Sequence, residues 1–281
     1  MIVSIIGSGT MAAGIAQVIC ASDEVKKIII VARDKQKAEQ VKASCLKGLS
    51  RLVRKGKLTE ESASQGVEKI ISTTELADVK NSELIIEAIS EDFAAKMSLF
   101  SEISEYINND TIVASNTSSL SITAFGSVLL NSKNVLGLHF FNPAPVMELV
   151  EIVMGHETSL EVVERLMLFT QSLGKSPVVV QEAPGFVVNR MLIPMINEAI
   201  SILAEGVATA EDIDKAMKFG AHHPMGPLAL ADLIGNDVNL SIMETLYSET
   251  GDPKYRAHPL LRKMVRANHL GRKTKKGFFE Y

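Results

Sequence analysis

A short glycine-containing loop near the N-terminus is the first place where residue types and spacing suggest chemistry. The loop Gly7-Ser8-Gly9-Thr10-Met11 directly follows an apolar run at 2–6 and directly precedes a helical pattern. Glycine at 7 permits a tight turn, and glycine at 9 lets the backbone approach a pyrophosphate at the positive end of the helix. An ordinary strand–helix turn could also carry two glycines. The flanking elements favour a dinucleotide site contacted by Gly7, Gly9, Thr10 and Met11.

The end of the second predicted strand bears on which dinucleotide binds. An acidic residue usually stands there to bind the adenosine ribose, but this sequence reads Ala32-Arg33-Asp34. A carboxylate near a 2′-phosphate would cost about 1–4 kcal/mol at ~4 Å, whereas an arginine could return about 1.5–3 kcal/mol. We therefore favour NADP(H) over NAD(H), with Ala32 and Arg33 at the cofactor. The alternative is that Arg33 is solvated at a helix start and Asp34 reaches the ribose.

Alternating strands and helices are expected to position these residues. Through the first two-thirds of the chain, short β-branched runs alternate with longer helical patterns. The nearly continuous apolar character of the runs is typical of a parallel sheet covered on both faces. This predicts an α/β fold, a Rossmann-type, doubly wound and mostly parallel sheet. Strands are predicted at 2–6, 28–32, 84–88, 111–114, 135–140, 147–153 and 177–181, and helices at 11–21, 35–55, 93–107 and 160–173.

The pattern changes at Ala183-Pro184-Gly185, beyond which only helical periods remain. We predict helices at 186–205, 210–219, 228–247 and 260–267, with a kink at Pro194. The 281 residues then form two domains, in line with roughly 150 residues per domain. These are a dinucleotide-binding Rossmann domain, 1–183, and an all-α domain for substrate and dimerisation, 184–281. The surplus of apolar residues in the second domain predicts a homodimer.

Composition excludes several classes of protein. The net charge is −4, from 29 basic and 33 acidic residues, so nothing global attracts nucleic acid or anionic lipid. We expect no membrane span and no signal peptide, hence a cytoplasmic location. Cys20 and Cys45 are predicted to be reduced thiols. Neither they nor His222 and His223 have metal-ligand spacing, so no metal site is expected.

Several motifs, taken in order, carry a resemblance to a known family. They are S-N-T-S-S at 115–119, H-F-F-N-P at 139–143, P-G-F-V-V-N-R at 184–190, H-P-M-G-P at 223–227 and G-R-K-T-K-K-G-F at 271–278. Together with the glycine loop, they span essentially the whole chain. The sequence resembles the short-chain L-3-hydroxyacyl-CoA dehydrogenases, and among them the bacterial 3-hydroxybutyryl-CoA dehydrogenases. The resemblance implies reversible hydride transfer between C4 of nicotinamide and C3 of a β-hydroxyacyl-CoA.

The resemblance also implies a catalytic set. His139, at a strand end, matches the catalytic histidine, whose near-neutral proton affinity suits a general acid/base. Glu151 matches the carboxylate that orients this imidazole. Ser118 and Asn189 match groups that bind the reacting oxygen, with Asn189 reaching in from the second domain to a substrate between the domains. Taken singly, His139 could be structural, Ser118 could cap a helix, and Glu151 and Asn189 could be surface groups.

Further contacts follow from the same resemblance. Lys96 and Ser118 match positions near the thioester, and Lys55 matches a coenzyme A contact. Lys55 also shares helical spacing with Arg51 and Arg54, a basic face that would suit acyl-CoA phosphates but could equally be only solvated. The positions expected to line the cofactor are Glu91, Lys96, Asn142 and Lys273.

These expectations imply the interconversion of acetoacetyl-CoA and (S)-3-hydroxybutyryl-CoA, with His139 as general acid/base. With NADPH the reductive direction is favoured, as in butyrate-forming fermentation, although use in β-oxidation stays open. Two alternatives also remain. One is a β-hydroxyacid dehydrogenase acting on free acids, which has the same two-domain plan. The other is a cofactor-binding relative without catalytic activity.

Overall fold

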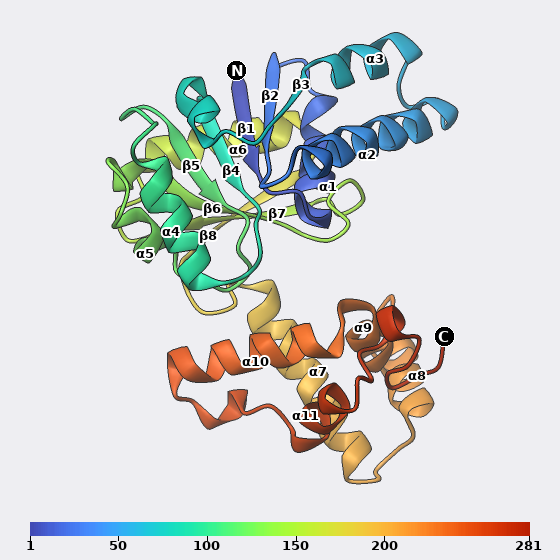
Figure 1. Ribbon diagram of the computed structural model, residues 1–281. Coiled ribbons are helices and arrows are strands. Elements are labelled where there is room, and N and C mark those ends of the chain that lie inside the picture. The colour runs from blue at the N-terminus through green and yellow to red at the C-terminus, as the bar shows by residue number, and fades with distance from the viewer. The chain divides into compact units, whose positions relative to one another are not determined.

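The computed structural model describes all 281 residues and divides into two compact units, Met1–Glu182 and Ala183–Tyr281. The first unit alternates strands and helices (Figure 1). Its strands are β1 Ile2–Ile6, β2 Lys27–Val31, β3 Ile70–Thr73, β4 Leu84–Glu87, β5 Ile112–Ser115, β6 Val135–Phe140, β7 Leu149–Met154 and β8 Ser176–Gln181. Its α-helices are α1 Thr10–Cys20, α2 Lys35–Arg54, α3 Glu60–Glu68, α4 Phe93–Ile103, α5 Ile122–Gly126 and α6 Leu160–Ser172.

The eight strands form one sheet in the order β3-β2-β1-β4-β5-β6-β7-β8. Every neighbouring pair is parallel except β6 and β7, which run antiparallel. The strand order reverses between β1 and β4, where doubly wound sheets open a crevice at the carboxyl ends of their strands. The Rossmann-type fold class predicted from the sequence is therefore confirmed.

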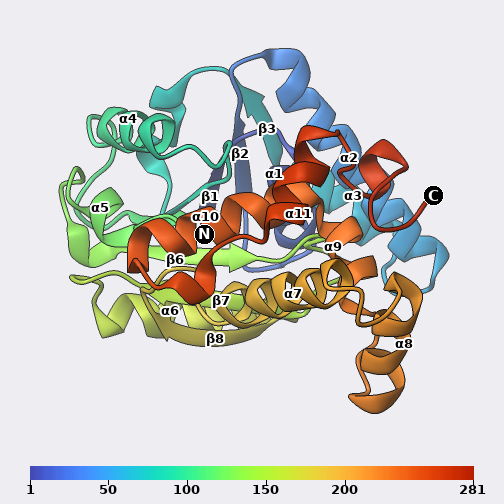
Figure 2. The same cartoon turned by 90° about the horizontal axis from the view of Figure 1, so that it is seen from below.

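Helices cover both faces of the sheet (Figures 1 and 2). On one face, Val3 and Ile5 of β1 belong to the same buried core as Ile15 of α1 and Leu166 of α6. On the other face lie α4 and α5, whose Phe100 and Phe125 rings stack with centroids 4.8 Å apart. Side chains alternate between the faces along each strand, so the residues between the core positions of β4, β5, β6 and β7 point towards α4 and α5. These residues include Glu87, Ser115, His139 and Glu151.

The second unit is helical. It contains α7 Val188–Ala204, α8 Ala210–Gly220, α9 Pro227–Ile234, α10 Asn236–Thr250 and α11 Pro259–Arg266. Its core is formed by apolar side chains such as Ile196, Leu228, Met243 and Leu261. Pro194 lies inside α7. No helix of the chain combines the length and the apolar character required to cross a bilayer.

The structure corrects several of the predicted elements. The single helix expected at 228–247 is wrong, because α9 and α10 meet at Gly235, whose φ of +108° interrupts the helix. The helix expected from 186 begins at Val188, since Phe186 has a φ of +51°. The sequence analysis also missed α3, the short helix α5 and the edge strand β3. Only Ile70 of β3 is buried, so the apolar signal of this strand is weak.

Candidate active site

The loop between β1 and α1 depends on glycine at position 7. Gly7 has a φ of +136°, a conformation that glycine adopts without steric cost. Its N–H donates to the carbonyl of Val31 at 2.9 Å. A Cβ at this position would lie 2.4 Å from the carbonyl oxygen of Ala88. The protein itself therefore requires the glycine that the sequence analysis assigned to the tight turn.

The second glycine of the loop has a different role. Gly9 is the N-cap of α1, with a φ of −77° and no side-chain cap for the helix. A Cβ built on Gly9 would meet no protein atom within 4 Å. Thr10 and Met11 form the first turn, where amides are left without intrahelical partners. Open space in front of uncapped amides fits the phosphates of a dinucleotide.

The end of β2 holds both groups considered for the ribose. Ala32 is buried, and its N–H donates to Thr73 O at 3.1 Å. Arg33 and Asp34 follow it and are both exposed. Asp34 is the N-cap of α2, where its carboxylate accepts a 2.7 Å hydrogen bond from the Gln36 N–H. Asp34 is thus already bound to the helix start, next to an exposed guanidinium.

His139 and Glu151 form a buried pair on adjacent strands. They are direct partners in the antiparallel register of β6 and β7. The Nδ1 atom of His139 lies 2.8 Å from Oε2 of Glu151, and the two residues are only 6% and 1% exposed. The Phe141 ring lies against the imidazole, with centroids 4.4 Å apart. Because Nδ1 is held by the carboxylate, proton exchange with a substrate falls to Nε2.

Asn116 links the end of β6, which carries His139, to the end of β4. Its side-chain Oδ1 accepts a 2.9 Å hydrogen bond from the N–H of Phe140, the residue after His139. Its own N–H donates to the backbone carbonyl of Glu87 at 2.8 Å. Asn116 therefore ties β6 to the ends of β4 and β5. The sequence analysis placed Asn116 inside a motif but gave it no role.

Glu91, itself a predicted cofactor contact, is hydrogen-bonded to Ser118, the predicted catalytic serine. Its Oε1 accepts hydrogen bonds from Thr117 Oγ1 at 2.6 Å, Ser118 N at 2.8 Å and Ser118 Oγ at 3.1 Å. Burial acts to raise the pKa of Glu91. The charge of Lys96 and the hydrogen bonds from Thr117 and Ser118 outweigh burial, so the pKa lies below its usual range. Glu91 is therefore a carboxylate at neutral pH.

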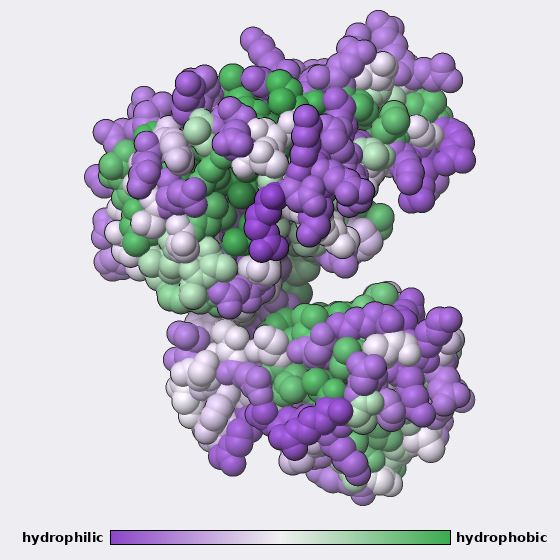
Figure 3. All heavy atoms as spheres, viewed as in Figure 1, coloured by the Kyte–Doolittle hydropathy of each residue, from purple (hydrophilic) through white to green (hydrophobic).

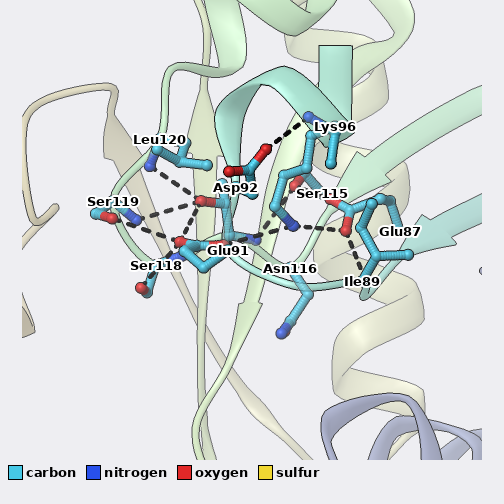
Figure 4. Close-up of polar contacts among 12 residues, drawn as sticks. Glu87, Ile89, Glu91, Asp92, Lys96, Ser115, Asn116, Ser118, Ser119 and Leu120 are labelled. Carbon is cyan, nitrogen blue, oxygen red and sulfur yellow. Dashed lines mark hydrogen bonds and ion pairs between the residues drawn. The ribbon is translucent and has the colours of Figure 1, made fainter. Parts of the chain in front are cut away.

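Lys96 is buried between two carboxylates. Its side chain is 1% exposed, and Nζ lies 2.5 Å from Glu87 Oε1 and 3.4 Å from Glu91 Oε2. Figure 4 shows the ammonium between the two glutamates. Glu87 itself is fully buried. The sequence analysis missed Glu87, although a lone glutamate closing the apolar strand Leu84–Glu87 is an unusual residue for a buried strand.

The remaining predicted residues of the first unit are exposed. Asn142 follows the end of β6, close in sequence to His139. Lys55 is the C-cap of α2, one turn from Arg51. With Arg54, these basic side chains form an exposed cluster at the C-terminal end of α2. Figure 3 shows hydrophilic and hydrophobic residues interspersed over the surface of the first unit. These exposed positions at the end of α2 are consistent with the basic helix face predicted from the spacing of Arg51, Arg54 and Lys55.

Two predicted residues belong to the second unit. Asn189 lies in the first turn of α7 and is 9% exposed. Lys273 lies in a short 3₁₀ helix, Arg272–Thr274, and its ammonium is 2.5 Å from the carboxylate of Asp237. The chain contains no group of three His, Cys, Asp or Glu side chains that could hold a metal ion.

The first unit thus combines, at the carboxyl ends of its strands, the parts needed for proton and hydride chemistry. The loop after β1 offers backbone amides to phosphates. A carboxylate-bound imidazole at the end of β6 can exchange a proton. The hydroxyl of Ser118 and the ammonium of Lys96 lie in one connected polar cluster between them.

Family models and solved structures give a consistent likeness. A model described as "3-hydroxyacyl-CoA dehydrogenase, NAD binding domain" matches residues 2–183, and the "C-terminal domain" model of the same name matches residues 185–281. The crystal structure of (S)-3-hydroxybutyryl-CoA dehydrogenase from Ralstonia eutropha is 43% identical, with a TM-score of 0.96 over 100% of this chain and 98% of that chain.

Curated proteins are similar over most or all of their lengths as well. The 3-hydroxybutyryl-CoA dehydrogenase of Clostridioides difficile is 50% identical over 283 residues, which cover 100% of this chain and 99% of the relative. The human mitochondrial hydroxyacyl-coenzyme A dehydrogenase is 40% identical over 290 residues, which cover 99% of this chain and 90% of the relative.

Proposed function

The chain belongs to the 3-hydroxyacyl-CoA dehydrogenase family, and from this membership we propose that it interconverts acetoacetyl-CoA and (S)-3-hydroxybutyryl-CoA. The observation that carries the proposal is the buried pair of His139 and Glu151, whose Nδ1 and Oε2 atoms are 2.8 Å apart. Such a pair is a general acid/base held in one orientation. A nicotinamide cofactor, once bound, supplies or accepts the hydride at C3 of the substrate.

His139 moves the proton of the reaction. In reduction, protonated Nε2 gives its proton to the C3 oxygen as hydride arrives at C3. In oxidation, neutral Nε2 takes the hydroxyl proton as hydride leaves. Glu151 stabilises the imidazolium that exists before reduction and after oxidation, because the negative carboxylate is hydrogen-bonded to Nδ1. Proton transfer by a positioned group contributes about 10²–10⁴-fold to the rate.

The other predicted residues are assigned to the ligands in the same proposal. Ser118 and Asn189 bind the reacting oxygen, and Lys96 lies near the thioester as well as the cofactor. The exposed cluster of Arg51, Arg54 and Lys55 suits the phosphates of coenzyme A. The cofactor contacts are Gly7, Gly9, Thr10, Met11, Ala32, Arg33, Glu91, Lys96, Asn142 and Lys273. The first unit is then the cofactor-binding domain, and the second contributes to the substrate site.

NADP(H) is the proposed cofactor in preference to NAD(H). The support is the exposed guanidinium of Arg33 beside a carboxylate, Asp34, whose Oδ1 is already bound to the Gln36 N–H at 2.7 Å. A 2′-phosphate would find the cation of Arg33, while the Asp34 carboxylate is held at the N-cap of α2. Physiological use would then be reductive, as in biosynthesis or fermentation.

A homodimer through the second unit is also proposed. Large apolar side chains of this unit are exposed in the single chain, including Met191 at 72%, Phe219 at 71% and Val207 at 69%. Exposed apolar surface of this kind is typical of an interface. Light scattering coupled to gel filtration would give twice the monomer mass if the proposal is right and the monomer mass if it is wrong.

The decisive test is an assay of acetoacetyl-CoA reduction at 340 nm, the nicotinamide absorbance band, with NADPH and NADH in parallel. We expect turnover with acetoacetyl-CoA and a higher kcat/KM with NADPH. A clear preference for NADH would contradict the cofactor proposal alone. Turnover of free acetoacetate but not of its CoA ester would instead indicate a β-hydroxyacid dehydrogenase. Cofactor binding without turnover of any acyl-CoA would indicate a non-catalytic relative.

A further inference from the structure

Glu87 is a fully buried carboxylate at the end of β4 that has no role in the proposed chemistry. Its Oε1 accepts hydrogen bonds from Lys96 Nζ at 2.5 Å and from Ile89 N at 2.7 Å, and its Oε2 accepts one from Ser115 Oγ at 2.5 Å. A buried charge is strongly unfavourable unless it is paired and hydrogen-bonded. Three donors, one of which is the cation Lys96, satisfy Glu87, so the surrounding segments are built around this carboxylate.

Each partner of Glu87 belongs to a different segment at the carboxyl ends of the strands, where the cofactor is proposed to bind. Lys96 lies on α4, Ser115 ends β5, and Ile89 lies in the loop after β4. That loop touches the glycine loop, because a Cβ on Gly7 would lie 3.3 Å from the Ile89 nitrogen. One carboxylate therefore fixes three segments that converge on the proposed cofactor and thioester contacts.

The contacts of Glu87 continue into a closed ring that reaches the catalytic serine. Ser115 Oγ accepts a hydrogen bond from Thr117 N at 3.2 Å, and Thr117 Oγ1 donates to Glu91 at 2.6 Å. Glu91 Oε2 lies 3.4 Å from Lys96, which returns the ring to Glu87. Ser118 is held on this ring by its N–H and its hydroxyl, both bound to Glu91. Figure 4 shows Ser118 on the Glu91 side, opposite Glu87.

The two carboxylates do not hold Lys96 equally. Nζ is 2.5 Å from the fully buried Glu87 and 3.4 Å from Glu91, whose side chain is 38% exposed. Charge attraction is much stronger in a buried site than at the surface. Glu87 is therefore the anchor of Lys96, and Glu91 is the contact that can yield when a ligand arrives.

We propose that Glu87 is a positioning residue for the reaction, which holds Lys96 and the segment Ser115–Ser118 in the geometry that meets cofactor and thioester. The proposal rests on the function proposed above for this site. It differs from a purely structural role, in which Glu87 would only stabilise the fold. A misplacement of about 1 Å in a site can cost on the order of 10²-fold in rate, so a positioning role predicts a large kinetic effect.

The first test replaces Glu87 with glutamine, which keeps the size and removes the charge. For Glu87→Gln we expect kcat/KM for acetoacetyl-CoA to fall by about 10- to 100-fold. The Kd of the reduced cofactor, measured by fluorescence titration, should rise by about tenfold. The matched control is Glu83→Gln, which changes an exposed glutamate at the opposite end of β4 whose Oε2 also accepts a backbone N–H, that of Ile2 at 2.7 Å. Both constants should stay within about twofold of wild type in this control.

A double-mutant cycle separates positioning through Lys96 from other effects. Lys96→Met should reduce kcat/KM strongly and lower Tm, because it leaves the Glu87 charge buried without its cation. Adding Glu87→Gln to Lys96→Met should raise Tm and cost less than about tenfold more in kcat/KM, since one of the two elements that Glu87 positions is already gone. This comparison remains available even if Glu87→Gln alone does not fold, because the double variant removes both charges.

Two results would overturn the proposal. One is a Glu87→Gln variant with a lower Tm but wild-type kcat/KM and cofactor Kd, which is the result for a structural role. The other is a double variant whose kcat/KM lies a further 10- to 100-fold or so, about the full loss expected of Glu87→Gln alone, below that of Lys96→Met. If the wild-type protein does not turn over acetoacetyl-CoA at all, the proposed function fails. The cofactor Kd of Glu87→Gln still decides the role of Glu87 in that case, with an unchanged Kd counting against it.

Discussion

Glu151 stands directly opposite His139 in the antiparallel pairing of β6 and β7, with its Oε2 2.8 Å from the imidazole Nδ1. This relationship depends on the one antiparallel strand pair of the sheet. Because β7 runs antiparallel to β6, a residue twelve positions later in the chain becomes the direct partner of His139 on the adjacent strand. The orientation of the imidazole is thus set by strand register. A backbone-defined pair is more exact than one formed between flexible loops.

Replacing His139 tests the proton transfer. We expect His139→Gln to lower kcat for acetoacetyl-CoA reduction by about 10²–10⁴-fold, the usual contribution of a general acid/base. The Kd of the reduced cofactor should change little, since glutamine keeps a similar size and the glycine loop is untouched. Initial rates at 340 nm and a fluorescence titration measure the two effects. Turnover close to that of wild type would show that His139 is not the acid/base.

Replacing Glu151 tests the orientation of the imidazole. Glu151→Gln keeps a hydrogen-bonding group at the same position but removes the negative charge that stabilises the imidazolium. We expect kcat to fall by about 10²-fold or more. Glu148→Gln, which changes an exposed residue just before β7, is the matched control and should keep wild-type kcat. Equal rates in the two variants would rule out a catalytic role for Glu151.

The sheet and the helical second unit could be predicted from the sequence because their signals are strong. Buried strands such as β1 and β6 are nearly continuous apolar runs, and the loop between β1 and α1 carries two glycines. The edge strand β3 was missed because three of its four residues are at least partly exposed. The break between α9 and α10 was missed because Gly235 sits within an otherwise continuous helical period. Only the backbone, with its φ of +108°, reveals the break.

The site was predicted less evenly. His139 and Ser118 lie in motifs that resemble a known family, and Glu151 was assigned from the same resemblance. Glu87 and Asn116 act through contacts between strands that are distant in sequence, such as the 2.5 Å contact between Glu87 and Ser115. Composition and periodicity carry no information on such contacts. A glutamate at the end of an apolar strand was the only available signal for Glu87.

The two glycines of the cofactor loop should respond differently to alanine. Gly7→Ala forces a side chain into a φ of +136° and against the Ala88 carbonyl, so we expect a loss of about 1–3 kcal/mol or more in the free energy of unfolding. Gly9→Ala should leave that free energy nearly unchanged, because its Cβ meets nothing within 4 Å.

Gly9→Ala should instead raise the cofactor Kd by about tenfold or more, equivalent to ~1.4 kcal/mol, since the new methyl group occupies the space proposed for the pyrophosphate. Urea unfolding and cofactor titration of both variants measure the contrast. A Gly9→Ala protein that is stable and binds cofactor like wild type would place the pyrophosphate elsewhere.

Arg33 should determine the preference for the phosphorylated cofactor. Charged hydrogen bonds to a 2′-phosphate contribute about 1.5–3 kcal/mol, so Arg33→Ala should lower kcat/KM for NADPH by about 10- to 150-fold. The value for NADH should change little. Lys35→Ala, which removes an exposed cation two residues further along, is the control for a general charge effect. Equal losses in both variants, or with both cofactors, would contradict a specific phosphate contact.

The pH dependence of stability should report on Glu91. The pKa of Glu91 is depressed in the folded protein, because Lys96 and the hydrogen bonds from Thr117 and Ser118 outweigh the effect of burial. A depressed carboxyl pKa stabilises the folded state above the unfolded-state value, and this stabilisation is lost as the pH falls through the folded-state value. Wild type should therefore exceed Glu91→Gln in free energy of unfolding at pH 7. This difference in free energy of unfolding should persist as the pH falls to the ordinary glutamate pKa of 4.5, and it should disappear below that pH. Urea unfolding of both proteins between pH 7 and pH 3 measures the gap, and a gap that widens on acidification would show that the carboxylate form of Glu91 does not stabilise the fold.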